Sequence, residues 1–491
     1  MARRIVVSAW LGLALAALFF YPLAAEFDAD IYYLQWQARD LVEAAVAVTA
    51  LALVLSGIIF AVWRRSSRAA TAVLLAVAAL PLASFAAGVS RQLPFDDTIR
   101  AAWEYRPVVI AVLLAAAGGV GLAFLAWPQL FGRWFRRLLV LVSPVSLVVL
   151  GGFITSAART DMVLAFERAP RAAAAVQRAC TPVLALLFDE LSFSYLYDDA
   201  GRLRPEFPEF SRFGRASTHY LSVRAPGSET LAALPSLLAA RRVERIEVAD
   251  EGLMEFMGAG RLVPFSAAEP DGLFATAQRL GLSTEMAGYY LAYCDLLADL
   301  VDTCQSLSLY NVSSTGGRFS PANPVLTTLI LWPRQFPFGL LKSPAFARHQ
   351  RQMVEELVAF ARRPMGVDPP VFRFIHFSVP HLPFVFDAEG YDPPFDPLQT
   401  ATDEGYVRQV RYVDRVLGDL LEGMRRAGTY DRTAIIVFAD HGYRFGGRER
   451  DPLHVPFVVK MAGQQSQANE RAAFQGEVLL KQVLQGACAS G

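Results

Sequence analysis

The sequence predicts an α-helical membrane anchor of five transmembrane helices, followed by an α/β domain. Three observations support this fold class. The 491 residues are 54% apolar, with a mean hydropathy of +0.32, which is too apolar for an ordinary soluble chain. The long apolar stretches all lie before about residue 157. After that point, short apolar runs alternate with helical periods, as in a layered α/β sheet.

Five apolar stretches each approach the roughly 20 residues that a helix needs to cross a bilayer. We interpret the first as a retained span, because it lacks a clear small-residue cleavage site for a signal peptidase. Together the five form the predicted anchor, residues 1–157. The predicted spans are Ile5–Ala25, Val42–Trp63, Ala69–Ser90, Pro107–Trp127 and Leu138–Thr155.

Basic residues in the short connections predict the orientation of these spans. Arginines precede the first span and lie in residues 64–68 and 133–137, whereas residues 26–40 are mostly acidic. By the positive-inside rule the amino terminus is cytoplasmic, and five crossings place the rest of the chain outside. No span has a charge at mid-membrane, which favours an anchor over a transporter. We therefore expect a multi-pass membrane protein whose domain after the spans lies outside the cytoplasm.

The remainder of the chain divides into three predicted segments. The Ala- and Arg-rich residues 158–178 predict an interfacial linker helix. Residues 179–463 predict a globular domain, and the polar residues 464–491 form a tail to which we assign no function. Within the domain, buried strands are predicted at Val183–Phe188, Val371–Phe377 and Ala434–Ala439, and one helix face at Val407–Met424 closes near Gly428.

Charge and cysteine content narrow the function classes. Forty-six basic and forty-six acidic residues cancel, so overall balance gives no indication of nucleic-acid binding. Four cysteines are too few for a disulfide scaffold and show no metal-binding CxxC spacing. Cys294 and Cys304 lie ten positions apart on the side predicted to be oxidising, and we predict a disulfide between them.

Ligand-type residues follow three of the predicted strands. Because open α/β sheets bind ligands at the carboxyl ends of their strands, residues placed there converge on one crevice. Carboxylate and imidazole donors together suit zinc or manganese better than calcium. A single carboxylate after a strand is usually a turn or cap residue, and the hypothesis rests on the whole set. The set comprises Asp189, Glu190, His376, His381, Asp440 and His441.

Thr230 is the candidate nucleophile. A turn containing Pro226 and Gly227 leads into an apolar helix that Thr230 opens. A hydroxyl at a helix amino terminus meets unpaired N–H groups and the positive end of the helix dipole, which favour an alkoxide and a bound phosphate. Thr is also a common helix cap, and Ser228 is an alternative nucleophile.

These motifs resemble the membrane-anchored branch of the alkaline phosphatase and sulfatase superfamily, which includes lipid A phosphoethanolamine transferases and lipoteichoic acid synthases. The resemblance covers nearly the whole chain and implies a sulfatase-like α/β domain with a central mixed sheet. It also implies a protein of the bacterial cytoplasmic (inner) membrane whose catalytic domain is periplasmic. The motifs that carry it are Asp189-Glu190, the Thr230–Pro235 segment, His376-x4-His381-x-Pro383 and Asp440-His441-Gly442.

The resemblance implies a metal-dependent enzyme that moves a phospho-head group from a membrane phospholipid donor to an envelope glycolipid or polymer acceptor through Thr230. It implies one or two divalent ions, zinc or manganese, with Asp189, Thr230, Asp440 and His441 as ligands of the first. Substrate-phosphate or second-metal positions then fall on Glu190, His376, His381 and His454. The chain departs from the transferases in having Asp189 before Glu190 where they have Glu as the first ligand. It also lacks cysteines beside Thr230.

Other functions stay open at this stage. A sulfatase-like hydrolase of sulfate or phosphate esters is one. Cys180-Thr-Pro182 begins the Cys-x-Pro-x-Arg motif of formylglycine sulfatases, but Leu184 replaces the Arg. A non-catalytic envelope binding protein is another. Arg444, Arg448 and Arg450 either clamp an anionic group or form a solvated basic face.

Overall fold

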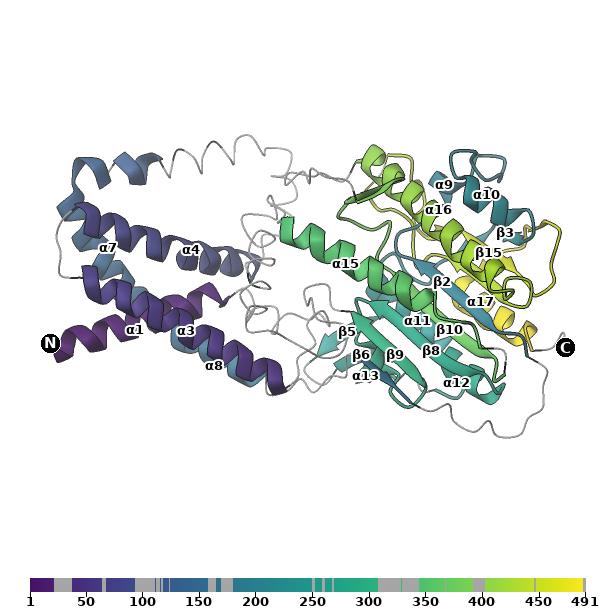
Figure 1. The fold of residues 1–491 in the computed structure, drawn as a ribbon, viewed down its shortest axis with the longest axis horizontal. Coiled ribbons are helices and arrows are strands. Elements are labelled where there is room, and N and C mark those ends of the chain that lie inside the picture. The colour runs from purple at the N-terminus through teal and green to yellow at the C-terminus, as the bar shows by residue number, and fades with distance from the viewer. Residues whose placement is uncertain are drawn as a thin grey trace. The chain divides into compact units, whose positions relative to one another are not determined.

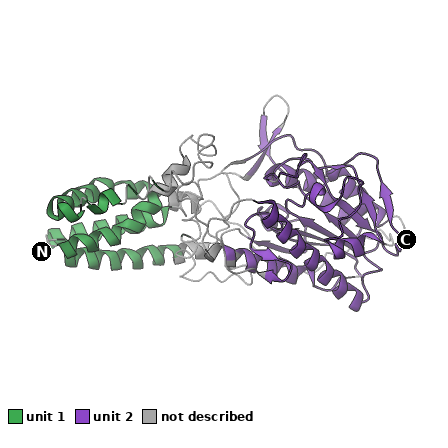
Figure 2. Ribbon diagram, turned by 90° about the horizontal axis from the view of Figure 1, so that it is seen from above, with its two compact units in different colours: residues 1–161, 319–346 green, residues 162–318, 347–491 purple. Residues whose placement is uncertain are grey.

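The computed structural model divides the chain into two compact units (Figure 2). Unit 1 comprises residues 1–161 and 319–346, and unit 2 comprises residues 162–318 and 347–491. The structure describes residues 1–21, 38–63, 68–92, 118–122, 124–157, 165–168, 180–249, 252–257, 261–266, 269–307, 344–366, 368–391, 402–445 and 447–488, together with residues 111, 115 and 328.

Unit 1 is helical. Its described part has four helical segments that are long and apolar enough to cross a membrane, at Ala2–Phe19, Ala44–Val62, Arg68–Phe85 and Pro128–Gly151. The last segment consists of two consecutive helices. The first three agree with predicted spans, and the fourth begins ten residues before the predicted Leu138–Thr155. The helices are α1 (Ala2–Phe19), α3 (Ala38–Val62), α4 (Arg68–Gln92), α7 (Pro128–Val142) and α8 (Val145–Ala157).

The predicted span Pro107–Trp127 lies largely outside the described residues. The count of five crossings therefore stays a prediction. The external placement of unit 2 depends on an odd number of crossings, so it stays a prediction as well.

Close helix contact holds unit 1 together. Leu11 and Leu15 of α1 and Ile59 of α3 are buried in one apolar cluster. At Gly12 a Cβ atom would collide with Ser56 Oγ and Ala52 O of α3, so only glycine permits this approach. Packing of this kind suits membrane helices, because lipid gives them little hydrophobic drive to associate.

Unit 2 is built on a nine-stranded mixed sheet in the order β1-β9-β8-β10-β2-β13-β15-β3-β16 (Figure 1). The run β9-β8-β10-β2-β13 is parallel, whereas β15 is antiparallel to both its neighbours. The predicted mixed sheet is therefore confirmed. The strands are β1 (Ala165–Glu167), β2 (Val183–Phe188), β3 (Thr218–Tyr220), β8 (Ser283–Tyr289), β9 (Thr303–Leu307), β10 (Val371–Phe377), β13 (Ala434–Phe438), β15 (Phe457–Lys460) and β16 (Ala468–Glu470).

The three strands predicted from sequence form the centre of this sheet. All residues of β2, β10 and β13 are buried, as expected of central parallel strands covered by helices. The predicted helix around Val407–Met424 is α16 (Asp403–Arg426), whose first turn is capped by Thr402 Oγ1 accepting from Gly405 N at 3.1 Å. The helix ends before Gly428, which adopts φ +66° as predicted for a closing residue.

The remaining elements surround the sheet. Helices α11, α12 and α17 pack against one another, and α16 packs against α10 and β11. The helices are α9 (Phe193–Leu196), α10 (Pro208–Gly214), α11 (Thr230–Ala239), α12 (Leu273–Arg279), α13 (Tyr293–Leu296), α15 (Pro344–Ala361) and α17 (Gly476–Gly486). Small sheets comprise β14 (His454–Val455), β4 (Val223–Arg224) and β17 (Phe474–Gln475), then β5 (Ile246–Ala249), β6 (Gly252–Met257) and β7 (Arg261–Pro264), and β11 (Phe386–Asp387) with β12 (Gly390–Tyr391).

The linker 158–178 is not helical in its described part. Residues 165–167 form β1, antiparallel to β9, and Arg168 N donates to Asp302 O at 2.8 Å. The prediction of a helix there was wrong for these residues. The backbone N–H and C=O groups of β1 pair with β9 at the edge of the sheet instead of with one another in a helix. This pairing outweighs the local helix propensity.

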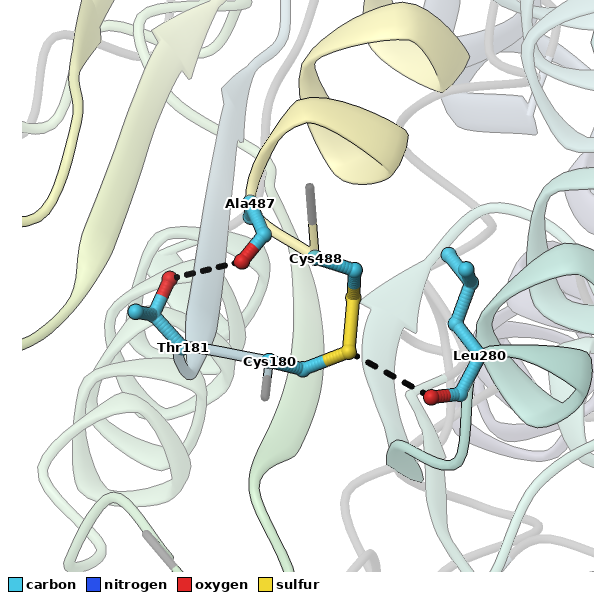
Figure 3. The surroundings of a disulfide bond; sticks show 5 residues. All are labelled: Cys180, Thr181, Leu280, Ala487 and Cys488. Carbon is cyan, nitrogen blue, oxygen red and sulfur yellow. Dashed lines mark hydrogen bonds between the residues drawn. A yellow bond between two sulfur atoms is a disulfide. The ribbon is translucent and has the colours of Figure 1, made fainter. Parts of the chain in front are cut away.

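Residues 464–488 of the predicted tail 464–491 are part of the fold of unit 2 and do not form a separate tail. They supply β16, β17 and α17, and α17 buries Leu480 and Leu484 completely. A disulfide that the sequence analysis missed, Cys180–Cys488, joins the end of this segment to the residues before β2 (Figure 3). Beside it, Thr181 N and Oγ1 donate to Ala487 O at 3.0 and 3.2 Å.

Cys180 Sγ also lies 3.3 Å from Leu280 O, and Figure 3 draws this contact as a dashed line. A disulfide sulfur carries no proton, so this is a sulfur–oxygen contact, not a hydrogen bond. The predicted disulfide Cys294–Cys304 is confirmed and links α13 to β9. All four cysteines of the chain are therefore paired.

We expect the double substitution Cys180→Ser/Cys488→Ser to lower the free energy of unfolding of unit 2 by roughly 2–4 kcal/mol, since this disulfide closes a long loop in the unfolded chain. The measurement is thermal or urea unfolding of the detergent-solubilised chain by near-ultraviolet circular dichroism. The matched control is Cys294→Ser/Cys304→Ser, whose cysteines are only 10 positions apart and which should cost less. An unchanged transition in the first variant would contradict the expectation.

A candidate metal centre beside a helix amino terminus

Adjacent parallel strands bring the predicted carboxylates together. Asp189 follows β2 directly, and Asp440 lies two residues after β13, the neighbouring strand in the sheet. His441 comes next in the chain. The carboxyl ends of these strands therefore meet at one edge, as the sequence analysis expected.

Asp189, Asp440 and His441 form a group that could hold a metal ion. Each offers a ligand atom, and these atoms lie within 4.8 Å of one another. His441 Nε2 is 3.5 Å from Asp440 Oδ2 and 3.8 Å from Asp189 Oδ1, and all three side chains are fully buried. Burial, with the charges of Asp440 and Glu190 nearby, raises the pKa of the Asp189 carboxyl well above its usual range.

The hydrogen bonds of His441 aim its ligand atom at the group. His441 Nδ1 lies 3.0 Å from Gly442 O, an atom that can only accept, so the ring proton is on Nδ1. In a neutral ring Nε2 is then the atom free to bind a cation, and it points at the carboxylates and at Thr230 Oγ1, 3.3 Å away. A backbone carbonyl that fixes the tautomer in this way is the usual support for a metal-binding histidine.

The unsatisfied atoms of the site fit a divalent cation. Asp189 Oδ1 and Asp440 Oδ2 are buried without a hydrogen-bond partner, although buried polar atoms are normally paired. Two carboxylates, one imidazole and a hydroxyl are a donor set that zinc or manganese accepts. A cation there would offset the burial and the negative charges of Asp440 and Glu190 that raise the pKa of Asp189.

Helix α11 carries Thr230 into the same group. Thr230 is its first residue, after Glu229 at the N-cap, and only 4% of its surface is exposed. The first N–H groups of a helix lack intrahelical partners and lie at the positive end of its dipole. The hydroxyl thus lies beside both the candidate metal ligands and a place suited to an anion.

Glu190 does not join the three ligands. Its backbone adopts φ +62°, unusual for a residue other than glycine, and is held there by Tyr406 Oη donating to Glu190 O at 2.5 Å and by Glu190 N donating to Asp440 Oδ1 at 3.2 Å. Its carboxylate accepts from Arg444 Nε at 2.9 Å. Burial alone would lower the pKa of Arg444. The negative charge of Glu190 and its hydrogen bond outweigh burial, so the pKa of Arg444 is raised. The geometry favours Asp189 as the ligand and Glu190 as the partner of Arg444.

His376, a residue of β10, is a neighbour of Asp189. Its Nδ1 is 2.8 Å from Tyr293 Oη, and its Nε2 faces Asp189 Oδ2 at 3.9 Å with no hydrogen-bond partner. The side chain is fully buried, which lowers the pKa of His376 to about 3. Complete burial favours a role in supporting Asp189 over the predicted contact with substrate.

His381 and His454 lie outside the three-ligand group. His381 Nδ1 donates to Leu382 O at 2.7 Å, which leaves Nε2 unprotonated, and burial lowers its pKa against the opposing charge of Glu190. His454 Nε2 donates to Leu221 O at 3.0 Å, and its ring stacks on Phe193 with centroids 3.9 Å apart. Their predicted substrate-binding roles stay predictions.

Tyr289 was missed by the sequence analysis. It ends β8, and its hydroxyl donates to Asp189 Oδ2. The rule that pointed to Asp189 and Asp440 applies here too, because β8 is another parallel strand that ends at this edge. The signal was overlooked because tyrosine is not a typical metal ligand.

With this geometry described, comparison with known proteins gives a family. Residues 183–480, more than half of the chain, match the family described as Sulfatase. Two curated relatives match shorter segments. The sulfatase YdeN of Escherichia coli K12 is 28% identical over 100 residues, 20% of this chain and 18% of YdeN. The lipoteichoic acid synthase of Staphylococcus aureus USA300 is 26% identical over 72 residues, 15% of this chain and 11% of the synthase. The matched segments thus cover less than a fifth of either relative.

Among solved structures, Ps i-CgsB in complex with k-i-k-neocarrahexaose aligns with a TM-score of 0.43 and 12% identity, over 63% of this chain and 72% of that one. The phosphonate monoester hydrolase of Agrobacterium radiobacter aligns with a TM-score of 0.40 and 14% identity, over 62% and 73%. At these scores the likenesses are distant.

We expect Asp440→Asn to abolish stoichiometric metal binding, because it removes one charged ligand atom while keeping the shape of the side chain. Elemental analysis of the detergent-purified full chain measures this. Asp419→Asn, at an exposed position of α16, is the matched control and should bind as the unaltered chain does. Equal metal in both variants would rule out this centre.

We expect Tyr289→Phe to weaken metal affinity by roughly 10–100-fold, the usual cost of losing a hydrogen bond to a metal ligand. Competition with a chromogenic chelator measures the affinity. Tyr220→Phe, which removes a tyrosine hydroxyl from β3 without touching the ligands, is the control. An affinity equal to that of the control would show that Tyr289 does not position Asp189.

Proposed function

The chain belongs to the sulfatase family, in the alkaline phosphatase superfamily of hydrolases and transferases, and we propose that it transfers a phospho-head group from a membrane lipid to an envelope acceptor through Thr230. The resemblance drawn from its motifs is thereby confirmed at the level of the superfamily. The curated relatives match too small a part of the chain to define a substrate.

The observation that carries the proposal is the position of Thr230. A buried hydroxyl at the start of α11 lies 3.3 Å from His441 Nε2 and interacts with Asp189 as well. A helix cap needs no such neighbours, and here the N-cap is Glu229. A nucleophile next to candidate metal ligands is the arrangement that covalent phosphoryl transfer requires.

In the proposed reaction, Thr230 Oγ forms a bond to the phosphorus of the lipid phosphodiester, and the bond from phosphorus to the lipid alcohol breaks. The lipid alcohol leaves with the proton that Thr230 gives up. An acceptor hydroxyl then attacks the phosphorus, and the Thr230 oxygen recovers a proton. A bound zinc or manganese ion would lower the pKa of the attacking hydroxyl and neutralise phosphate oxygens.

Residues of the chain supply the remaining functions. Asp189, Asp440 and His441 would hold the ion, and the amino terminus of α11 binds phosphate oxygens through its N–H groups. His381, whose Nε2 carries no proton, would accept the proton of the entering alcohol. Arg444 is held by Glu190 and keeps its charge next to the group.

Two features support a lipid substrate on the oxidising side of a membrane. Unit 1 contains four candidate spans in its described part. Unit 2 contains two disulfides, which persist in compartments such as the periplasm and are rare in the cytosol. A domain tethered to the bilayer meets a lipid donor at high effective concentration.

The pairing of Cys180 disfavours a sulfatase that depends on formylglycine. That residue would have to be a free thiol before its oxidation, and Cys180 is bonded to Cys488. The remaining cysteines are paired with each other. Thr230 is then the better candidate for the attacking group.

We expect Thr230→Ala to reduce turnover of a chromogenic phosphodiester by at least roughly 1,000-fold, because removal of a nucleophile abolishes the covalent route. Metal content should stay near that of the unaltered chain, since the two carboxylates and His441 remain. Thr230→Ser restores a hydroxyl and should recover part of the activity.

Ser228→Ala is the matched control, two residues earlier in the same turn, and should retain full turnover. Loss of activity in Ser228→Ala with retention in Thr230→Ala would assign the nucleophile to Ser228. Full activity in both variants would refute a covalent mechanism through this helix.

A further inference from the structure

A hollow of about 470 Å³ lies in unit 2, and none of its lining residues belongs to the metal group or to α11. Its size is typical of small-molecule sites, roughly 300–1,000 Å³. Phe193, Arg450 and His454 line it, together with Arg204, Arg448 and Arg471. It thus combines aromatic rings with arginines drawn from three separate segments of the chain.

The arginines that line the hollow are not neutralised by neighbouring carboxylates. Within the described part of the chain, Arg204, Arg448, Arg450 and Arg471 form no ion pair with a carboxylate. Arg204 Nε is moreover buried without a hydrogen-bond partner. Arginines without a carboxylate partner are suited to charge-assisted hydrogen bonds with an oxyanion in the hollow.

Most of the carboxylates that line the hollow are already engaged. Asp198 pairs with Arg202, and Asp451 pairs with Arg224. Glu449 accepts hydrogen bonds from Ser192 Oγ and Ser194 Oγ. Among the described carboxylates that line the hollow, only Asp199 has no such partner. The positive charge of the four arginines therefore exceeds the negative charge that remains in the hollow.

An aromatic stack forms another wall. Phe193 stacks on Tyr197 and on His454, with ring centroids 4.4 and 3.9 Å apart. Phe193 and His454 are only half-buried, so they present surface to the hollow. Phe193 has both ring faces covered by these partners, so the stack gives the hollow an apolar wall of ring edges that the C–H groups of a sugar can contact.

The hollow borders the metal group. Gly442 follows His441 in the chain, and its N–H donates to Pro452 O at 2.6 Å. A Cβ atom on Gly442 would lie 3.0 Å from Glu449 Oε2, one of the lining residues. A ligand held in the hollow would therefore lie beside the segment that carries His441.

We propose that this hollow binds a sugar ring that carries a phosphate or sulfate ester, with the arginines on the oxyanion and the aromatic stack on the ring. The binding site itself does not depend on the transferase function. Its further role, in which an anionic acceptor sugar binds here before the transfer step, rests on the proposed function.

The test uses the full chain in detergent with Thr230→Ala, which prevents turnover. Calorimetry measures binding of glucose 6-phosphate, glucose 6-sulfate, glucose and inorganic phosphate. We expect a sugar ester to bind more tightly than glucose or inorganic phosphate, because only the esters use both walls. The two esters show which oxyanion is preferred.

The decisive variant is Arg450→Ala/Arg471→Ala. Both side chains are exposed, so the fold should tolerate their loss. We expect ester affinity to fall roughly 10-fold or more, since charge-assisted hydrogen bonds to the oxyanion are lost. Arg261→Ala/Arg411→Ala removes two exposed arginines that do not line the hollow and should change nothing.

Ester affinity that is equal in the two double variants, or binding of inorganic phosphate as tight as that of the esters, would overturn the proposal. In the second case the anion would be at the metal group alone. Turnover of a small phosphodiester by Arg261→Ala/Arg411→Ala with Thr230 intact should be unchanged. If instead Thr230→Ala retains turnover while ester binding behaves as expected, the proposed function fails and the binding site stands.

Discussion

The rest of unit 2 depends on two buried carboxylates that face each other at the ends of neighbouring parallel strands. Asp189 and Asp440 have no exposed surface, and each keeps one oxygen without a partner. Like charges at that depth are unfavourable unless a cation lies between them. His441 with its fixed tautomer, the tyrosine on Asp189 and the left-handed backbone at Glu190 are all consistent with a site organised around a cation.

The fold holds these groups by fixing β2, the strand that carries Asp189. Its carboxyl end lies between β10 and β13, and its amino end follows Cys180, which is bonded to Cys488. The last helix of the chain is thus tied to the strand at the centre of the site. A constraint of this kind limits the freedom of the unfolded chain and keeps β2 in place.

Local pattern was sufficient for much of the sheet and for part of the site. Continuous apolar runs predicted β2, β10 and β13, because central parallel strands are buried on both faces. The convergence of Asp189, Asp440 and Thr230 followed from the strand-end rule and from a helix start. Residues 165–167 and the carboxyl-terminal segment were misjudged, because their structure depends on pairing with β9 and β3, which are distant in sequence.

Sequence alone was sufficient to predict the apolar helices of unit 1, the α/β class of unit 2, the Cys294–Cys304 bond and the candidate ligands, since periodicity, spacing and residue type are local properties. The tertiary structure decided that Asp189 faces the ligand group while Glu190 holds Arg444. It also decided that His376 lies buried behind Asp189 and that four separate segments surround one hollow. Those outcomes depend on side-chain direction and long-range packing, because neighbours in space are set by the whole fold.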